Sequence, residues 1–192
     1  MATINYALKE ISYKIVYYGC GMCGKTTNLQ VIHSILPDTA KGNLVSLATQ
    51  QDRTLFFDFL PVDLGTVNGL KARFQVYTTP GQSFYSATRK IVLRGADGVV
   101  FVADSQWDRM RENLASWQSL ATDLAEHGMA IADMPTVIQY NKRDLPNTAP
   151  VDYLEKLLNP DGRQSFSSIA SSGEGVVNTL KAISKGVLIR AT

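Results

Sequence analysis

The sequence predicts an α/β fold in which a mostly parallel β-sheet carries helices on both faces. Three observations support this prediction. Short β-rich runs alternate with helical stretches along the chain. Two of these runs are apolar nearly throughout, as strands covered on both faces are. The Asn68-Gly69 pair lies between two other runs and predicts one antiparallel edge hairpin. The 192 residues contain no repeat, low-complexity segment or linker, so we expect one domain over residues 1–192.

Five segments have the composition of strands. Residues 13–18 (YKIVYY) form the first, and residues 55–64 and 70–78 flank the Asn-Gly turn. Gly98–Asp104 (GVVFVAD) and Thr136–Asn141 follow as the two strands that we expect to be buried on both faces.

Three segments have helical periodicity. Residues 25–36 carry apolar side chains at helical spacing and end before Pro37, which cannot continue a helix. Two later segments repeat apolar residues every three or four positions, which predicts one buried face in each helix. The first stripe is Met110, Leu114, Trp117, Ala121 and Leu124, and the second is Val176, Leu180, Ile183 and Val187.

Composition and terminal sequences exclude several classes of partner and indicate the cellular compartment. A net charge of +2 without a basic cluster gives no electrostatic reason to expect nucleic acid or an anionic membrane. No apolar run approaches the roughly 18–20 residues that span a bilayer. The N-terminus lacks a signal-peptide pattern, residue 2 is Ala rather than Gly, and the C-terminal LIRAT has no prenylatable cysteine. We therefore expect a cytoplasmic protein that reaches a membrane only through a partner.

The strongest local motif is GCGMCGKT, residues 19–26, which matches G-x-x-x-x-G-K-T without interruption. It lies between a predicted strand and a predicted helix, where its glycines let successive N–H groups point at an anion. The positive end of the helix adds to that attraction. We expect Lys25 to reach the β- and γ-phosphates of a nucleotide and the Thr26 hydroxyl to bind Mg²⁺.

The same loop holds Cys20 and Cys23, the only cysteines of the chain. Their spacing also fits a thioredoxin-like redox pair, or half of a zinc site to which only His33 and His127 could add imidazole ligands. The redox interpretation leaves Gly24-Lys25-Thr26 unexplained, and neither histidine has metal-motif spacing to the cysteines. A milder hypothesis is that Cys23, near a helix N-terminus and beside Lys25, has a lowered thiol pKa and is oxidisable.

The NKRD sequence from Asn141 indicates that the base is guanine. It follows the predicted strand Thr136–Asn141, at the edge where α/β sheets bind ligands. Guanine offers two adjacent donors, N1–H and N2–H₂, and the Asp144 carboxylate can accept both, whereas adenine would leave it unpaired. Asn141 can serve the other edge of the base and connect this loop to the phosphate loop. We expect Lys142 to lay its aliphatic stem along the base, and a backbone N–H near Ala170 to meet the guanine oxygen.

With these motifs the chain resembles the Ras-type small GTPases over nearly its whole length, and more narrowly the bacterial MglA family. The narrower resemblance rests on GKTTNL from Gly24, RTLFFDF from Arg53, TPGQ from Thr79 and NKRDL from Asn141. It implies the P-loop NTPase fold of small GTPases, binding of GTP and GDP with Mg²⁺, and GTP hydrolysis.

The resemblance also implies roles for residues near the γ-phosphate. Thr54 would join Mg²⁺ only while the γ-phosphate is present, and Gln82 would orient the attacking water. Gly81 would turn its N–H to the γ-phosphate, and a side chain at Gly21 would crowd the water. Arg53 would serve as an arginine finger in cis, against the alternative that it is a solvated arginine.

Two departures from the pattern matter. The D-x-x-G motif reads Thr78-Thr79-Pro80-Gly81, without a carboxylate, as in the MglA family. We hypothesise that Asp58 replaces the missing acid through a water. The loop residues 20–23 also depart from the proline and serine expected in that family, but they spare the glycines.

We therefore expect a slow GTPase switch that is stimulated by a partner. The resemblance implies an MglB-like Roadblock-domain dimer as the activating partner, polarity or motility effectors, and recruitment to a cell pole. We expect partners to distinguish the GTP-bound from the GDP-bound form by contacting residues 37–53 and 83–94. The alternative is a GTP-loaded scaffold without significant turnover.

The predicted site comprises catalytic Gln82, Arg53 and Thr54, metal-binding Thr26 and Thr54, and nucleotide-binding Gly19, Gly21, Cys23, Gly24, Lys25, Thr26, Thr27, Gly81, Asn141, Lys142, Asp144 and Ala170.

Overall fold

A computed structural model describes residues 3–48, 54–67, 69–82 and 85–191 of the chain. Its helices are α1 (Lys25–Ile35), α2 (Ser86–Leu93), α3 (Met110–Ala125), α4 (Val151–Leu158) and α5 (Val176–Ala191). Its strands are β1 (Thr3–Asn5), β2 (Glu10–Tyr18), β3 (Val45–Ala48), β4 (Thr54–Val67), β5 (Leu70–Thr78), β6 (Gly98–Asp104), β7 (Thr136–Asn141) and β8 (Ser165–Ser167).

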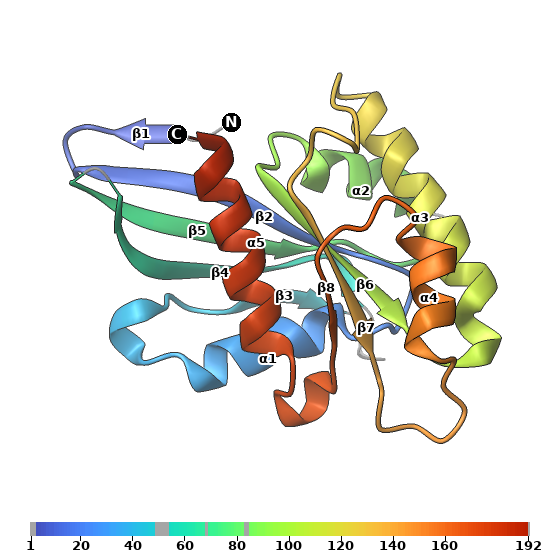
Figure 1. Cartoon of the computed structure of the whole chain (residues 1–192). Helices are drawn as coiled ribbons and strands as arrows, with labels where there is room; N and C mark the ends of the chain where they lie inside the picture. Colours follow the sequence, from blue (N-terminus) through green and yellow to red (C-terminus); the bar gives the residue numbers. More distant parts are fainter. Residues whose placement is uncertain (1–2, 49–53, 68, 83–84, 192) are drawn as a thin grey trace.

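The strands form one mixed sheet with the order β3-β4-β5-β2-β6-β7-β8, and β1 pairs with β2 outside this path. The strands from β5 to β8 in this order are parallel, whereas β3, β4 and β5 pair antiparallel. Figure 1 shows the parallel strands fanning through the molecule, with the antiparallel strands at one edge. This arrangement confirms the predicted mostly parallel sheet with an antiparallel edge hairpin.

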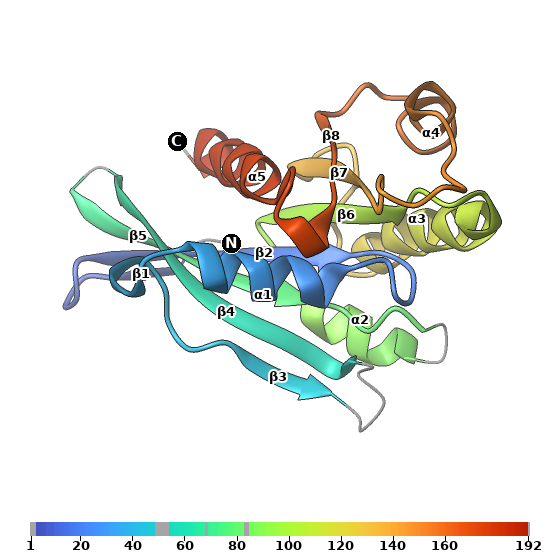
Figure 2. The same ribbon diagram turned by 90° about the horizontal axis from the view of Figure 1, so that it is seen from below.

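The helices cover both faces of the sheet. Alternate residues of β2 separate the two layers: Ile15 and Tyr17 belong to a core cluster with α1 and α5, whereas Val16 and Tyr18 belong to a cluster with α2, α3 and α4. Figure 2 shows α1 and α5 apart from the group of α2, α3 and α4. Every residue of β6 is buried, because this strand lies between the two layers.

Most predicted elements lie where the sequence placed them. β5, β6 and β7 have the predicted bounds, and β2 begins three residues before the expected Tyr13. β4 and β5 pair up to Val67 and Leu70, while Asn68 lies outside the described residues. The first helix ends at Ile35 rather than Leu36, because the residue before a proline favours an extended backbone, and Leu36 has ψ 141°.

The apolar stripe predicted for α3 is only partly buried, whereas all four residues of the α5 stripe are buried. In α3, Met110 and Leu124 are buried, but the three residues between them in the stripe are partly exposed. Two polar side chains, Asn113 and Asp123, occupy the buried face instead. Both take part in hydrogen bonds next to the site described below. Within the described part of the chain, no helix is long and apolar enough to cross a lipid bilayer.

Candidate functional site

The phosphate loop connects β2 to α1 and has backbone conformations that favour glycine at both ends. Gly19 has φ 152° and Gly24 has φ 104°. A Cβ atom at Gly19 would lie 2.2 Å from the Val102 carbonyl oxygen, and one at Gly24 would lie 2.2 Å from Asn141 Nδ2. The two glycines therefore let β6 and β7 approach the loop closely, which fixes its position at the carboxyl edge of the sheet.

Lys25 is buried at the base of this loop. Its ammonium group donates to the carbonyl oxygens of Gly19 at 2.9 Å and Cys20 at 2.7 Å. These contacts hold the amine inside the curve of the loop, where an anionic ligand would meet it.

Asn141 connects the phosphate loop to the loop after β8. Its side-chain nitrogen donates to the Cys23 carbonyl at 2.8 Å, and its oxygen accepts from the Ala170 N–H at 2.9 Å. Asn141 is only 2% exposed, so these two bonds are shielded from water. The predicted connection is therefore present in the fold. The Ala170 N–H thus donates to this asparagine, and its expected contact with the guanine oxygen stays a prediction.

A pocket of about 210 Å³ lies beside this connection. Its lining includes the predicted residues Gly24, Thr27, Asn141, Lys142, Asp144 and Ala170, together with Met22, Leu145 and Ser171. Asp144 is exposed and lies in the lining of the pocket. Among the described residues, no side-chain hydrogen bond or ion pair occupies it.

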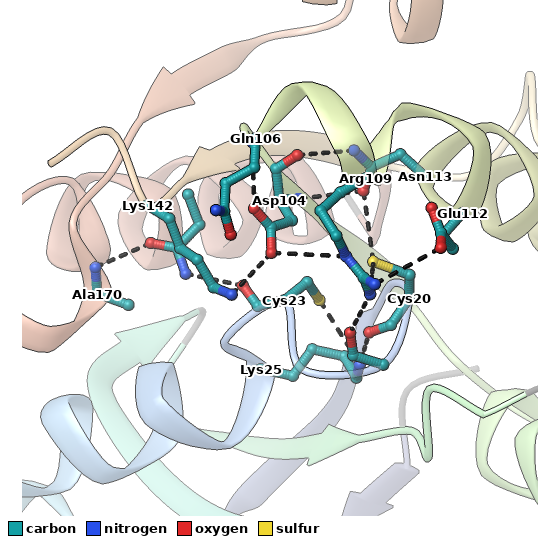
Figure 3. A network of polar contacts seen from close by, with 12 residues as sticks. Cys20, Cys23, Lys25, Asp104, Gln106, Arg109, Glu112, Asn113, Lys142 and Ala170 are labelled. Atoms are coloured by element: carbon teal, nitrogen blue, oxygen red, sulfur yellow. Dashed lines mark hydrogen bonds and ion pairs between the residues drawn. The ribbon is translucent and has the colours of Figure 1, made fainter. Parts of the chain in front are cut away.

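Lys142 lies across the rim of the same pocket. It has a left-handed backbone with φ 66°, and its ammonium group lies 2.7 Å from Oδ2 of the buried Asp104 (Figure 3). This ion pair fixes the far end of Lys142, which lines the pocket, and the expected stacking of its aliphatic stem on the base stays a prediction.

The other end of the loop meets the segment after β5. A Cβ atom at Gly81 would lie 2.4 Å from the Gly21 nitrogen and 2.5 Å from the Cys20 carbonyl carbon, so the two backbones are in direct contact. Gly21 itself has room: its nearest neighbours would be Gly81 at 3.9 Å and Gln82 Cγ at 4.0 Å. The structure therefore brings Gln82 next to Gly21. Arg53 lies outside the described residues. Thr54 begins β4, but its side chain is not described.

Asp58 is buried in β4 beside the predicted metal ligand. Its Oδ2 accepts from the hydroxyl groups of Thr26 and Thr78, both at 2.7 Å, and its other oxygen accepts from Ser46. Thr78 also accepts a 2.8 Å bond from the Asp58 N–H. The threonine at the D-x-x-G position thus holds a carboxylate that comes from the neighbouring strand.

Sequence reasoning missed a buried ionic network behind Gln82. Arg89 in α2 donates to the Gln82 carbonyl at 2.7 Å and to the Tyr18 hydroxyl at 3.1 Å, and it lies 3.5 Å from the Asp123 carboxylate. Tyr18 completes the network with a 2.8 Å bond to Asp123. The only indication in the sequence was a polar residue at a helix position that faces the core. This indication is not specific unless the fold is known.

Arg109 is a second residue that the sequence did not reveal. It follows β6 in a short 3₁₀ turn (Trp107–Arg109) and donates to the Gly21 carbonyl at 2.9 Å. The guanidinium also lies 3.9 Å from Asp104 and 3.5 Å from Glu112. The tip of the phosphate loop is thereby attached to the start of α3 (Figure 3). In the ranges that the structure describes, no three His, Cys, Asp or Glu side chains gather as a metal cluster.

A phosphate loop and a base-side loop joined by one asparagine, at the carboxyl edge of a parallel sheet, define a guanine-nucleotide-binding protein of the P-loop class. Known proteins give the same assignment. The Ras family model matches residues 14–187. The chain is 54% identical over 188 residues to the mutual gliding-motility protein MglA of Myxococcus xanthus, across 98% of this chain and 96% of that protein.

Two of the more distant relatives are eukaryotic proteins. The Ras-related protein Rab-13 of Bos taurus is 24% identical over 127 residues, or 65% of this chain and 60% of that protein. The Ras and EF-hand domain-containing protein of Xenopus tropicalis is 25% identical over 191 residues, or 95% of this chain but 24% of that protein. The chain therefore belongs to the Ras family of small GTPases, alongside MglA, and is a GTP hydrolase.

Proposed function

We propose that this single-domain chain is a switch that binds GTP and GDP with Mg²⁺, hydrolyses GTP slowly by itself, and is stimulated by a partner. The observation that carries the proposal is the position of Asn141, which joins the phosphate loop to the loop after β8 beside a pocket of base size. Asp144 accepts the two donors of guanine, Lys142 covers the base, and the loop amides with Lys25 hold the phosphates.

Mg²⁺ would neutralise charge on the β- and γ-phosphates. We assign Thr26 and Thr54 as its ligands and Asp58 as the acid that accepts from its water. The donor set fits: the buried carboxylate lies 2.7 Å from the Thr26 hydroxyl, and Thr78 holds it there. Thr26 would bind the cation through a lone pair of its hydroxyl oxygen and would keep donating its proton to Asp58.

The Asp58 assignment is tested by the Mg²⁺ concentration needed to retain GDP. Asp58→Asn should raise the midpoint about tenfold or more, because a neutral amide binds a metal-bound water more weakly. Asp63→Asn is the matched control, since it lies on the same strand but pairs with Lys71 and Arg73 at the surface. An unchanged midpoint in Asp58→Asn would remove the assignment.

Hydrolysis would depend on the residues around Gly21. Gln82 would orient the attacking water, Gly81 would donate its N–H to the γ-phosphate, and Thr54 would join the metal only in the GTP state. We assign Arg53 as the arginine finger in cis, placed by the partner. The contact between Gly81 and the Cys20–Gly21 peptide supports the assignment of Gly81 and Gln82.

The proposed partner is an MglB-like Roadblock-domain dimer, and the output is cell polarity or motility with recruitment to a cell pole. The similarity to a gliding-motility protein over nearly the whole chain supports this proposal. Residues 37–53 and 83–94 would form the surface that reads the switch. Each segment contains an exposed apolar side chain: Val45 is 46% exposed and Ile91 is 72% exposed.

Single-turnover GTP hydrolysis, with and without such a partner, tests the function. The proposal predicts strong stimulation for the wild type and its loss in Gln82→Ala and in Arg53→Ala. The alternative, a GTP-loaded scaffold, would bind GTP tightly and show no hydrolysis under either condition. If Arg53→Ala retained the stimulation, Arg53 would be a solvated side chain and not an arginine finger.

A further inference from the structure

The two cysteines of the chain have no role in the function proposed above, which uses the backbone of their loop. Both thiols are free and buried, and they are close enough to influence each other's ionisation. Cys20 Sγ also contacts Asn113 Oδ1 at 3.4 Å. Figure 3 shows the sulfur atom of Cys20 next to Arg109 and Asn113, and that of Cys23 on the side of Lys25.

The two sulfur atoms differ in their access to small molecules. Cys20 lines a cavity of about 440 Å³ whose wall also includes Gln82, Arg89 and residues of α3. Cys23 is fully buried. A small oxidant that enters this cavity would therefore meet Cys20 first, with Cys23 positioned behind it.

Two cations flank the pair and favour a thiolate. Lys25 Nζ lies 3.6 Å from Cys23 Sγ, and Arg109 Nη2 lies 3.9 Å from Cys20 Sγ. Burial opposes ionisation of Cys23, but its interaction with the neighbouring Cys20 thiol and the charge of Lys25 outweigh it and lower the pKa of this thiol. The same interaction, together with burial, raises the pKa of Cys20. The two cations and the lowered pKa of Cys23 thus favour a pair with a single negative charge, which is the state that reacts with oxidants.

We propose that Cys20 and Cys23 are a modification site: a hydroperoxide converts them to a reversible disulfide that weakens guanine-nucleotide binding. After a proton passes from Cys20 to Cys23, the Cys20 thiolate attacks the peroxide oxygen and the O–O bond breaks, which gives a sulfenic acid and an alkoxide or hydroxide that takes a proton from solvent water and leaves as an alcohol or water. Cys23 then attacks the Cys20 sulfur, the S–S bond forms, and the hydroxyl group leaves as water with the Cys23 proton. The two thiols supply the two electrons that reduce the peroxide.

The coupling to the nucleotide follows from the neighbours of Cys20, and this half of the inference rests on the proposed nucleotide site. Bond formation draws Cys20 away from Asn113 and Arg109 and toward Cys23. The Cys20–Gly21 peptide, against which Gly81 is packed, must move with it. Because binding linkage is reciprocal, a bound nucleotide must disfavour the disulfide by the same factor.

The experiment treats the GDP-loaded protein with hydrogen peroxide, alkylates the remaining thiols, and measures the tryptic peptide of residues 15–25, which contains both cysteines. It is done in a Met22→Leu background, because this thioether is 75% exposed in the same peptide and also reacts with peroxide. The proposal predicts a peptide that has lost two hydrogen atoms and takes up no alkylating label until dithiothreitol is added. Two alkylatable thiols, or a single oxygenated sulfur without the bond, would overturn it.

Release of a fluorescent GDP analogue tests the coupling in the same samples. Oxidised protein should release it about tenfold faster or more, the effect of losing one hydrogen bond to a charged phosphate, and dithiothreitol should reverse the change. In Cys20→Ser and Cys20→Ala, peroxide should leave the release rate of each variant at its own starting value. A disulfide that forms without changing release would overturn the coupling and leave the proposed GTPase function intact.

Discussion

The base-side end and the γ-phosphate end of the site are built differently. At the base-side end, one buried asparagine makes two hydrogen bonds that join the phosphate loop to the loop after β8. At the other end, Gly81 touches the loop through backbone contact, and Gln82 is held by its carbonyl, which leaves its side chain free to turn. Under the proposed function, the contacts that select guanine are thus built into the fold, whereas sensing of the third phosphate would depend on a few contacts that a ligand or partner completes.

The largest effect should come from the base-side end. Asp144→Ala should weaken GDP and GTP binding roughly 10³-fold, because it removes two charge-assisted hydrogen bonds from the base. Asp133→Ala is the control, since that carboxylate is exposed on the loop before β7. Calorimetric titration measures both variants. If the two variants bound the nucleotides with equal affinity, the base would have to bind away from Asp144.

Two glycine substitutions should affect different properties, one at the γ-phosphate end of the site and one at the base-side end. Gly21→Val keeps an allowed backbone and adds atoms toward Gln82, so it should retain nucleotide binding but lose partner-stimulated hydrolysis by about 10²-fold or more. Gly24→Ala has a left-handed backbone and a Cβ 2.2 Å from Asn141, so it should lose binding itself. Nucleotide retention and single-turnover rates are the measurements. If both variants lost the same property, the two ends would not be separable.

A smaller effect on turnover should come from the buried network. Arg89→Ala leaves the Asp123 carboxylate unpaired, which should cost about 3–5 kcal/mol of stability and slow hydrolysis roughly tenfold at unchanged GDP affinity. Lys90→Ala breaks an exposed pair with Glu126 and should cost less than about 1 kcal/mol. Thermal unfolding of the GDP-bound proteins, with single-turnover rates, checks both values. If folded Arg89→Ala hydrolysed GTP at the wild-type rate, the network would contribute to stability and not to hydrolysis.

The sequence predicted the parts of the site that depend on local chain order. The phosphate loop and the NKRD loop could be identified because each is a short motif next to a strand of recognisable composition. Asp58 was suspected, but its bonds to Thr26 and Thr78 depend on the register of β4 against β5, which shifts between Asp63 and Thr66 and which the predicted hairpin does not specify. Arg89 and Asp123 could not be found, since their contact joins two helices whose packing the sequence does not reveal.

The most direct test of the comparison between the two ends is hydrogen exchange of the GDP-bound and GTP-analogue-bound protein, measured by mass spectrometry. The account predicts that protection changes between the two states in residues 37–60 and 79–94. It predicts no change in residues 141–145 and 169–173, because the guanine contacts are the same in both states. Equal changes at both ends, or changes confined to the base-side loops, would contradict it.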